Sequence, residues 1–504
     1  MSQNTSEPGA VIQTDSISKK AFLAGLWVAL SSGSTGFLSL IQTIVVARLL
    51  YPADLGLMGM ASLALWTLHV FTQPGIEAAL IYRKELDDEA ASTAWTISVC
   101  RGLALFGLLW AGAPWVAVFF REPRLTALIR GLAGVSLVDG LANIWVVSFQ
   151  KELNFKRQAA FEQLTQVASV ATTLVAVAVL RDVWALVIGR LAGALVRTIS
   201  SYFFAARHPT WKLNREVARQ LLAYGRHIMG INILAFFLTQ GDDAFVGRVL
   251  GTAALGFYGL AYRLSNLPRG VISQILLRIT FPLYSKLRED RSQMELVYRR
   301  IVEINSLLAV PFTGALMVLA PEIVQVVYGA RWLPAVPALR ILCVFGLIRA
   351  LNVAIGSLLQ AIGLPNRVEK ICAIQLLLMA ITIYPMGRGF GIAGVSACVT
   401  LANGLGLAML LRDIRRDAGF PVRIWLVAQR TPFWGTCAAA AIVYAVSQAL
   451  PGESTVTRVI ALGLLGSAVY VGCIFQDRSA VSQLRAVVGY ACERLPLFRG
   501  KWKI

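Results

Sequence analysis

Long apolar stretches separated by short polar turns dominate the chain. Apolar segments recur from residue 21 to residue 475, and each approaches or exceeds the roughly 20 residues that a helix needs to cross a hydrocarbon core of about 30 Å. Clusters of Pro, Gly and charged residues separate them, as at residues 51–54 and 121–124. We predict about fourteen transmembrane helices, over residues 21–47, 55–80, 91–119, 125–149, 161–180, 183–206, 221–247, 255–276, 296–320, 335–360, 368–387, 390–411, 431–450 and 457–475.

Composition supports an integral membrane protein over a soluble one. Apolar residues make up 57% of the chain and charged residues only 15%, and the mean hydropathy is +0.66. The net charge of +20 would suggest nucleic acid in a soluble protein. Here most basic residues lie in short loops, where anionic lipid headgroups account for them, so we expect no nucleic-acid partner.

The distribution of basic residues predicts the orientation. If the N-terminus is cytoplasmic, 30 of the 47 Lys and Arg residues fall in cytoplasmic loops and the tail, eight fall outside, and nine lie within helices. Cytoplasmic loops carry the excess of positive charge in membrane proteins. We therefore expect both termini in the cytoplasm, with an even number of helices.

An internal repeat relates two halves of the chain. Residues 48–61 align with residues 248–261 at an offset of 200, with seven of fourteen positions identical. Six predicted helices separate the copies, so the halves share one orientation and are related by a pseudo-two-fold axis along the membrane normal, with a substrate site expected between them. The predicted parts are a cytoplasmic segment 1–20, a first lobe 21–206, a second lobe 207–411, a loop with the last two helices 412–475, and a basic cytoplasmic tail 476–504.

Six short sequence motifs, in a fixed order along the chain, resemble those of a known family. They lie at residues 47–56, 75–83, 150–157, 242–251, 255–263 and 281–286. With these motifs the chain resembles polysaccharide transporters of the multidrug/oligosaccharidyl-lipid/polysaccharide (MOP) exporter superfamily, the Wzx-type flippases. The resemblance covers roughly residues 20–411.

The resemblance implies an all-α membrane fold of two six-helix bundles around a central cavity, plus two C-terminal helices. It also implies a cargo, an oligosaccharide linked to undecaprenyl pyrophosphate, which crosses from the cytoplasmic to the periplasmic leaflet of a bacterial inner membrane. The product would serve exopolysaccharide or lipopolysaccharide biosynthesis. Membrane lipids, a polymerase and a chain-length regulator are the other implied partners.

Arginines within the predicted helices are the candidates for binding this cargo. A charge at mid-membrane costs about 2.5–3.5 kcal/mol on insertion scales, so such residues are expected to be functional. The planar guanidinium pairs well with phosphate oxygens. Arginines near helix ends can reach the interface, and Arg190 and Arg197 share one face of their helix because they are seven residues apart. We predict a headgroup site formed by Arg190, Arg197, Arg263 and Arg349, with Arg101 as a fifth candidate.

Three acids also lie deep in the predicted helices. Asp139, Asp242 and Asp243 can pair with the arginines or bind a coupling ion, and we favour pairing. The three His and seven Cys residues show no metal-ligand spacing, so we expect no metal and no cofactor.

Other functions remain open at this point. A cation-coupled drug exporter of the same superfamily would use an acid-rich cavity, and the surplus of deep arginines argues against it. A membrane glycosyltransferase or ligase needs a large extracytoplasmic loop, but the longest predicted outer loop, about 321–334, is short. No catalytic motif supports an enzyme. A scaffold for a synthesis complex is a third alternative.

The predicted topology has a direct test. A reporter fused after Arg416 should show cytoplasmic activity, because this residue lies in a basic loop assigned to the inner face. A reporter fused after Arg121 should show periplasmic activity. A periplasmic signal from the first fusion would contradict the orientation.

Overall fold

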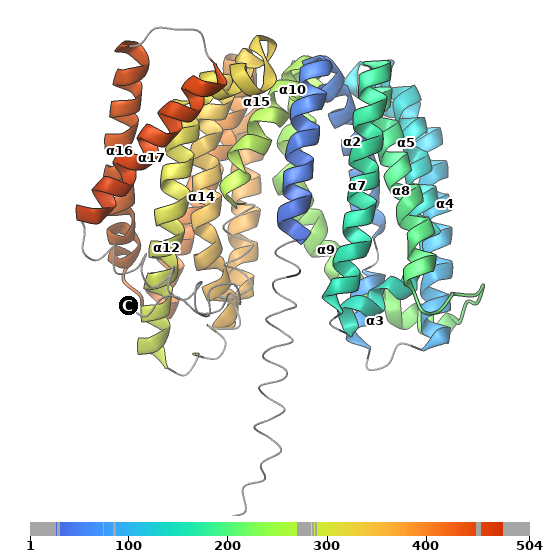
Figure 1. Cartoon of the computed structure of the whole chain (residues 1–504). Helices are drawn as coiled ribbons and strands as arrows, with labels where there is room; N and C mark the ends of the chain where they lie inside the picture. The colour runs from blue at the N-terminus through green and yellow to red at the C-terminus, as the bar shows by residue number, and fades with distance from the viewer. Residues whose placement is uncertain are drawn as a thin grey trace, which may run out of the picture. The chain divides into compact units, whose positions relative to one another are not determined.

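The computed structural model describes residues 27, 31–73, 75–83, 87–152, 154–269, 284, 287, 290–449 and 455–476. All regular secondary structure in these residues is helical, as the apolar pattern predicts. The contacts divide the chain into two compact units, unit 1 over Met1–Ala253 and unit 2 over Ala254–Ile504. Figure 1 labels the helices of both.

Unit 1 begins with a helix over residues 31–49. Long helices alternate after it with short helical segments at their ends. They are α2 (Pro52–Thr72), α3 (Ile76–Tyr82), α4 (Asp88–Phe120), α5 (Leu125–Gly140), the 3₁₀ turn η1 (Ile144–Val147), α6 (Ser148–Lys151), α7 (Phe155–Leu180), α8 (Trp184–Phe204), α9 (Arg215–Phe245) and the π-helical η2 (Val246–Leu250).

Unit 2 is also built from long helices with short helical segments at some of their ends. Its elements are α10 (Thr252–Ser265), which starts two residues before the unit boundary, α12 (Arg291–Val318), α13 (Ala320–Ile323), the π-helical η4 (Val324–Tyr328), the 3₁₀ segment η5 (Ala330–Ala335), α14 (Val336–Ala361), α15 (Pro365–Asp413), the π-helical η6 (Ile414–Ala418), α16 (Val422–Ala449) and α17 (Val456–Gln476).

In the described part of the chain, eight helices are long and apolar enough to cross a membrane, or nine if α5 and the segment after it form one span. The protein is therefore a multi-pass membrane protein, and the exact count of fourteen stays a prediction. The two expected helices 368–387 and 390–411 both lie in α15, which is broken at Gly391, where φ is 59°. Glycine adopts this left-handed conformation without a steric penalty.

Two predicted helices are interrupted. The helix expected over 55–80 is divided into α2 and α3, with Gly75 between them at φ 58°. The helix expected over 125–149 ends at Gly140, and the chain bends by 72° before Ile144–Lys151. The prediction of one continuous helix was wrong at both places. The first break falls where the sequence carries the turn-forming residues Pro74 and Gly75, and the second falls at Leu141, Ala142 and Asn143, where hydropathy alone gives little sign of a bend.

The repeat predicted from the sequence forms the same local structure twice. In the first copy a helix ends at residue 49 and α2 starts at Pro52. In the second copy η2 ends at Leu250 and α10 starts at Thr252, after Gly251 at φ 94°. The two helix starts are thus 200 residues apart, as aligned.

The compact units do not follow the predicted lobes 21–206 and 207–411. Helix α9, which the sequence places at the start of the second lobe, packs against α2, α3 and α4 and belongs to unit 1. The predicted lobes are defined by the repeat, and they stay a prediction about how the helices are related.

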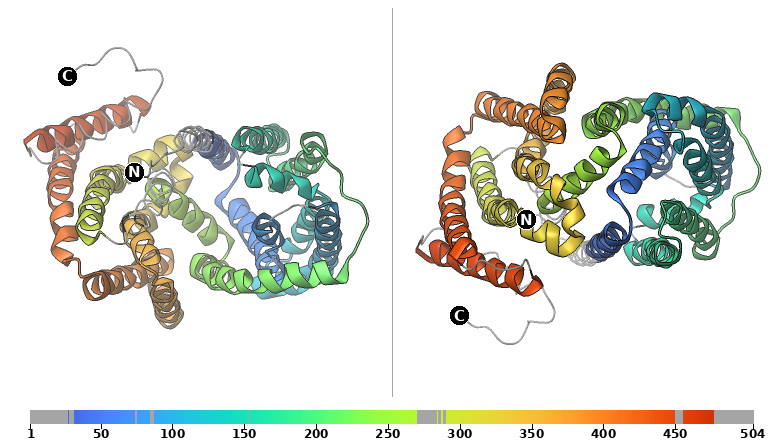
Figure 2. Two further views of the ribbon diagram at one scale, coloured as in Figure 1. Left: turned by 90° about the horizontal axis from the view of Figure 1, so that it is seen from below. Right: turned by 90° about the horizontal axis from the view of Figure 1, so that it is seen from above.

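Small residues let the helices of unit 1 approach closely. Helices α7 and α8 lie side by side, as the end-on views in Figure 2 also show. Gly189 and Gly193 of α8 are four residues apart and face α7, where a Cβ on Gly193 would lie 2.8 Å from the Cβ of Ser169. The Ser169 hydroxyl donates to the Gly189 carbonyl at 3.1 Å. This spacing of small residues is typical of close contacts between membrane helices.

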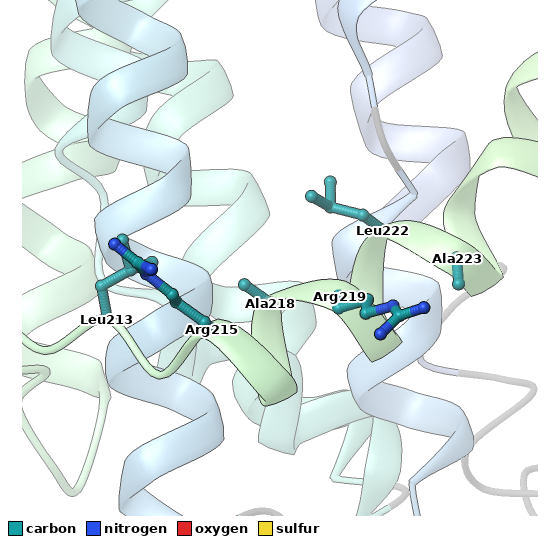
Figure 3. A pocket seen from close by; sticks show the side chains of 6 residues that line it. All are labelled: Leu213, Arg215, Ala218, Arg219, Leu222 and Ala223. Carbon is teal, nitrogen blue, oxygen red and sulfur yellow. The ribbon is translucent and has the colours of Figure 1, made fainter.

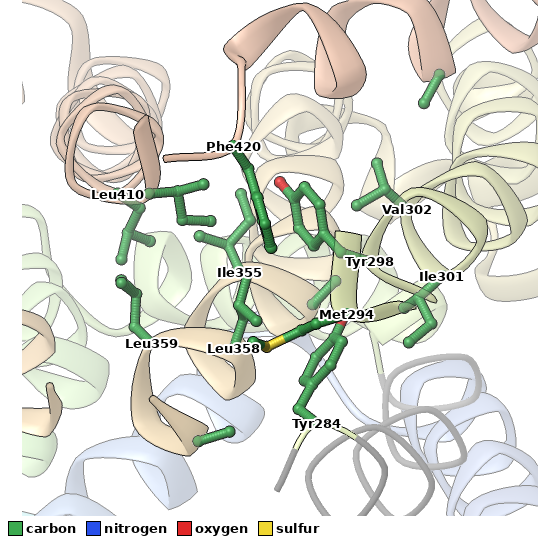
Figure 4. Close-up of a cluster of buried hydrophobic side chains, with 14 of the residues drawn as sticks. Tyr284, Met294, Tyr298, Ile301, Val302, Ile355, Leu358, Leu359, Leu410 and Phe420 are labelled. Carbon is green, nitrogen blue, oxygen red and sulfur yellow. The ribbon is translucent and has the colours of Figure 1, made fainter. Parts of the chain in front are cut away.

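The main core of unit 2 lies where α12, α14, α15 and α16 meet. Figure 4 shows Tyr298 and Phe420, whose rings stack with centroids 5.8 Å apart. Ile355 and Leu358 of α14 pack in the same cluster and are fully buried. The cluster holds the C-terminal end of α14 in place.

The close contact of α7 with α8 gives a stability prediction. Replacing Gly189 with Val should lower the free energy of unfolding by about 1–3 kcal/mol, because the added side chain would meet Thr173 and force the helices apart. A Cβ at Gly107 of α4 meets nothing within 4 Å, so Gly107→Val is the matched control. Thermal unfolding of the purified protein in detergent would compare the two, and equal melting temperatures would contradict the packing.

Candidate functional site

Arg101 of α4 is held by the last turn of α2. Its Nη2 donates to the Nδ1 and the carbonyl oxygen of His69, both at 3.1 Å, and its Nε donates to the Thr72 hydroxyl at 3.3 Å. The side chain is half-buried. All three contacts are to neutral acceptors, because the His69 nitrogen that accepts a hydrogen bond carries no proton.

Arg197 of α8 forms an ion pair with Asp139 of α5. The Arg197 Nη1 and the Asp139 Oδ1 are 3.8 Å apart, and the exposed fractions of the two side chains are 45% and 28%. The adjacent Thr198 hydroxyl donates to the Val138 carbonyl at 2.8 Å, which fixes α8 against α5 at this level. This contact places a deep acid against an arginine, which is the arrangement that the sequence favours.

These groups form one cluster in unit 1. The charges of both Arg101 and Arg197 act on His69, so the two arginines lie near the same side chain. We call Arg101, Arg197, Asp139, His69 and Thr72 the first arginine cluster. It combines two guanidinium groups with one carboxylate in ion-pair range.

The cluster depends on a close approach of α4 and α5. A Cβ on Gly102 would lie 3.0 Å from the Cα of Gly140 and 2.8 Å from the Ser136 carbonyl oxygen. Gly102 directly follows Arg101, and Gly140 directly follows Asp139. The two charged residues are therefore brought to the same level by the glycines beside them.

Arg349 of α14 is the centre of a similar arrangement in unit 2. Its Nη1 donates to the Tyr262 hydroxyl at 2.8 Å and to the Asn266 Oδ1 at 3.3 Å. Its guanidinium also lies over the Phe345 ring, 5.2 Å from the centroid. The positive charge of Arg349 acts on Arg269. Arg349, Arg269, Tyr262 and Asn266 form the second arginine cluster.

A glycine again permits the contact. A Cβ on Gly346 would overlap the backbone of Ser265, so α14 and the end of α10 touch there. Gly346 lies one turn before Arg349, and Ser265 directly precedes Asn266. The close approach brings the Asn266 amide within reach of the guanidinium.

Four other predicted residues lie on α8, α9 and α10. Arg190 is half-buried on α8 and has a polar partner of its own. Arg263 of α10 is exposed, and its charge opposes the effect of burial on Tyr328, which raises the pKa of that phenol to about 12. Asp242 is buried and Asp243 half-buried on α9, and both have partners.

Sequence reasoning did not identify the uncharged residues that accept hydrogen bonds in the two clusters. From the sequence alone, the histidines were weighed only as metal ligands, and Thr72 and Asn266 were not singled out. Arginines near predicted helix ends were set aside, and Arg269 is one of them. Hydropathy and charge carry no signal for neutral hydrogen-bond acceptors, but polar side chains on helices next to a deep arginine could have suggested them. In the described residues no group of three or more His, Cys, Asp or Glu side chains is placed to hold a metal ion.

Comparison with known proteins agrees with this architecture. The lipopolysaccharide biosynthesis protein WzxC of Escherichia coli K12 is 23% identical over 441 residues, which cover 87% of this chain and 90% of that protein. Among solved structures, the lipid II flippase MurJ matches with a TM-score of 0.74 at 15% identity, covering 89% of this chain and 97% of that chain.

A multidrug resistance MATE family transporter of the MOP superfamily matches with a TM-score of 0.61 at 15% identity, over 78% of this chain and 98% of that one. The two structures confirm the predicted helical fold of the MOP superfamily. Residues 45–337 match the family described as polysaccharide biosynthesis protein. This stretch is more than half of the chain, which therefore belongs to the polysaccharide biosynthesis protein family.

Proposed function

We propose that the chain is a flippase for oligosaccharide repeat units linked to undecaprenyl pyrophosphate. It moves them from the cytoplasmic to the periplasmic leaflet of a bacterial inner membrane, for exopolysaccharide or lipopolysaccharide biosynthesis. Family membership over residues 45–337 and the name of the Escherichia coli relative support the pathway. Both termini are cytoplasmic in this proposal, as the loop charges predict.

The observation that carries the proposal is positive charge that the protein itself does not neutralise. Arg349 is held by a phenol and an amide, and no described carboxylate forms an ion pair with it. Arg101 is held by a neutral imidazole and a hydroxyl, and Glu77 acts on it only from beyond ion-pair distance. A charge removed from water is stable only when it is paired. An anionic cargo supplies the missing partner.

Pyrophosphate fits these groups chemically. Hydrogen bonds between a guanidinium and a phosphate oxygen are charge-assisted and about twice as strong as neutral ones. The neutral acceptors orient each guanidinium but leave other N–H groups available for the phosphates. A headgroup that leaves the membrane surface can exchange water for such donors, which lowers the cost of entering the membrane.

Asp139 has a separate role in this scheme. Its long ion pair with Arg197 holds the arginine when no cargo is bound, and a phosphate competes with the carboxylate for the same guanidinium. Release of Asp139 then makes that carboxylate available to a coupling cation or proton. Asp242 and Asp243 on α9 are the other candidates for coupling.

The proposed protein transports its cargo without chemical change. It depends on a polymerase and a chain-length regulator only as later steps of the same pathway. The arginines act by binding and releasing the pyrophosphate, and no residue is assigned a catalytic role. No cofactor is needed for this cycle.

Deletion of the gene tests the function. Cells that still make the lipid-linked repeat unit should accumulate it in the cytoplasmic leaflet and lose the surface polysaccharide, and the full chain should restore both. Resistance to cationic compounds should not change. Loss of resistance together with normal polysaccharide would support a drug exporter and contradict the flippase.

Replacement of Arg349 tests the site in the same complementation assay. Arg349→Gln should lower export about 10- to 100-fold, because a hydrogen bond to a charged group contributes about 1.5–3 kcal/mol. Arg340→Gln is the matched control, since Arg340 is exposed and nine residues earlier on the same helix. Both variants should reach the membrane in normal amounts. Equal export by the two would contradict the role of the second cluster.

A further inference from the structure

An open hollow lies at the start of α9, and none of its lining residues belongs to either arginine cluster. It has a volume of about 530 Å³ and is lined by Leu213, Arg215, Ala218, Arg219, Leu222 and Ala223. Figure 3 shows the Arg215 and Arg219 side chains extending to opposite sides of Ala218, with Leu222 beside them. The segment belongs to a loop that the charge distribution assigns to the cytoplasmic face.

The segment before α9 is fixed to unit 1 by several hydrogen bonds. The Thr96 hydroxyl donates to the Lys212 carbonyl at 3.0 Å, and the Asn214 amide donates to Glu89 at 2.7 Å. The Asn214 side chain also caps α9, because its oxygen accepts from the backbone of Glu216 at 2.8 Å. The hollow is therefore built on an ordered part of the protein.

The first turns of α9 are amphipathic. Val217 and Leu221 are buried in a cluster with α3 and the start of α4. The opposite side exposes Arg215, Arg219 and Leu222. A helix with one apolar face and basic residues beside exposed apolar ones is typical of a segment lying in the membrane interface.

The two arginines of the hollow have no described partner. Neither Arg215 nor Arg219 forms a hydrogen bond or ion pair with any described residue, whereas the nearby carboxylates are already engaged: Glu89 accepts from Asn214 and Glu216 from Gln220. Exposed apolar side chains continue the surface, with Trp211 at 65% and Leu213 at 59% exposure. The site therefore offers two cations beside an apolar surface, which complements a molecule with an anionic head and an apolar body.

We propose that this hollow binds the headgroup of an anionic phospholipid of the cytoplasmic leaflet. The guanidinium groups contact the phosphate, and Leu213, Leu222 and Trp211 contact the glycerol backbone and the first methylenes. A zwitterionic lipid supplies a phosphate whose charge is cancelled by its own ammonium group, so it binds more weakly. The lipid holds the start of α9 at the membrane surface.

The test uses the purified full-length protein in a neutral detergent. Dioctanoyl phosphatidylglycerol, dioctanoyl phosphatidylcholine and glycerol 3-phosphate are titrated separately, and binding is followed by native mass spectrometry. Phosphatidylglycerol should bind more tightly than the other two. Equal binding of the two lipids by the wild-type protein would overturn the proposal without any variant, and equal binding of glycerol 3-phosphate would overturn the choice of a lipid over a free phosphate.

The double variant Arg215→Gln/Arg219→Gln locates the site. Its binding of phosphatidylglycerol should be about 30-fold weaker, given about 1 kcal/mol per basic residue near a membrane surface and 1.4 kcal/mol per factor of ten. The control Arg415→Gln/Arg416→Gln removes two exposed charges from η6 and should bind as the wild type does. Equal losses in both double variants would contradict a site at α9. The assay does not depend on transport, so its outcome is independent of the flippase test.

Discussion

Placing a guanidinium among membrane helices requires polar partners, and neutral partners hold it without cancelling its charge. Arg101 and Arg349 meet this requirement in the same way. Each lies on a long apolar helix and donates to neutral groups of a neighbouring helix, to His69 on α2 and to Tyr262 on α10. These neighbours are the two helices that begin 200 residues apart in the repeat. The repeat thus supplies, in each unit, a helix whose neutral side chains hold an arginine.

Close packing of glycines makes these contacts possible. Hydrogen bonds near 3 Å between helices need backbones that approach more closely than large side chains allow. Gly102 lies beside Arg101, and Gly346 lies one turn from Arg349. Gly346 touches the backbone of Ser265, next to Asn266, which accepts from Arg349, whereas Gly102 touches α5, which carries Asp139, the partner of Arg197. A larger residue at either position would therefore disturb these contacts through helix spacing.

The helical fold and the repeat could be predicted from the sequence, because apolar length and local similarity are properties of short segments. Intramembrane charge is also visible in short segments, and it selected Arg101, Arg197 and Arg349 as candidates whose role in binding cargo stays a prediction. The neutral partners could not be predicted, since the contact of His69 with Arg101 joins residues 32 positions apart on separate helices. The membership of α9 in unit 1 was missed for the same reason, because packing between helices leaves no periodic signal.

The helix breaks also shape one end of unit 1. With a straight helix over 55–80, the residues of α3 would extend α2 along its axis. The turn at Gly75 instead directs α3 against α4 and α9, where Leu80 and Leu221 share one buried cluster. Burial of that face of α9 leaves the adjacent face, with Arg215 and Arg219, exposed beside the hollow. A local backbone feature thus determines which side of a basic helix remains available to the membrane surface.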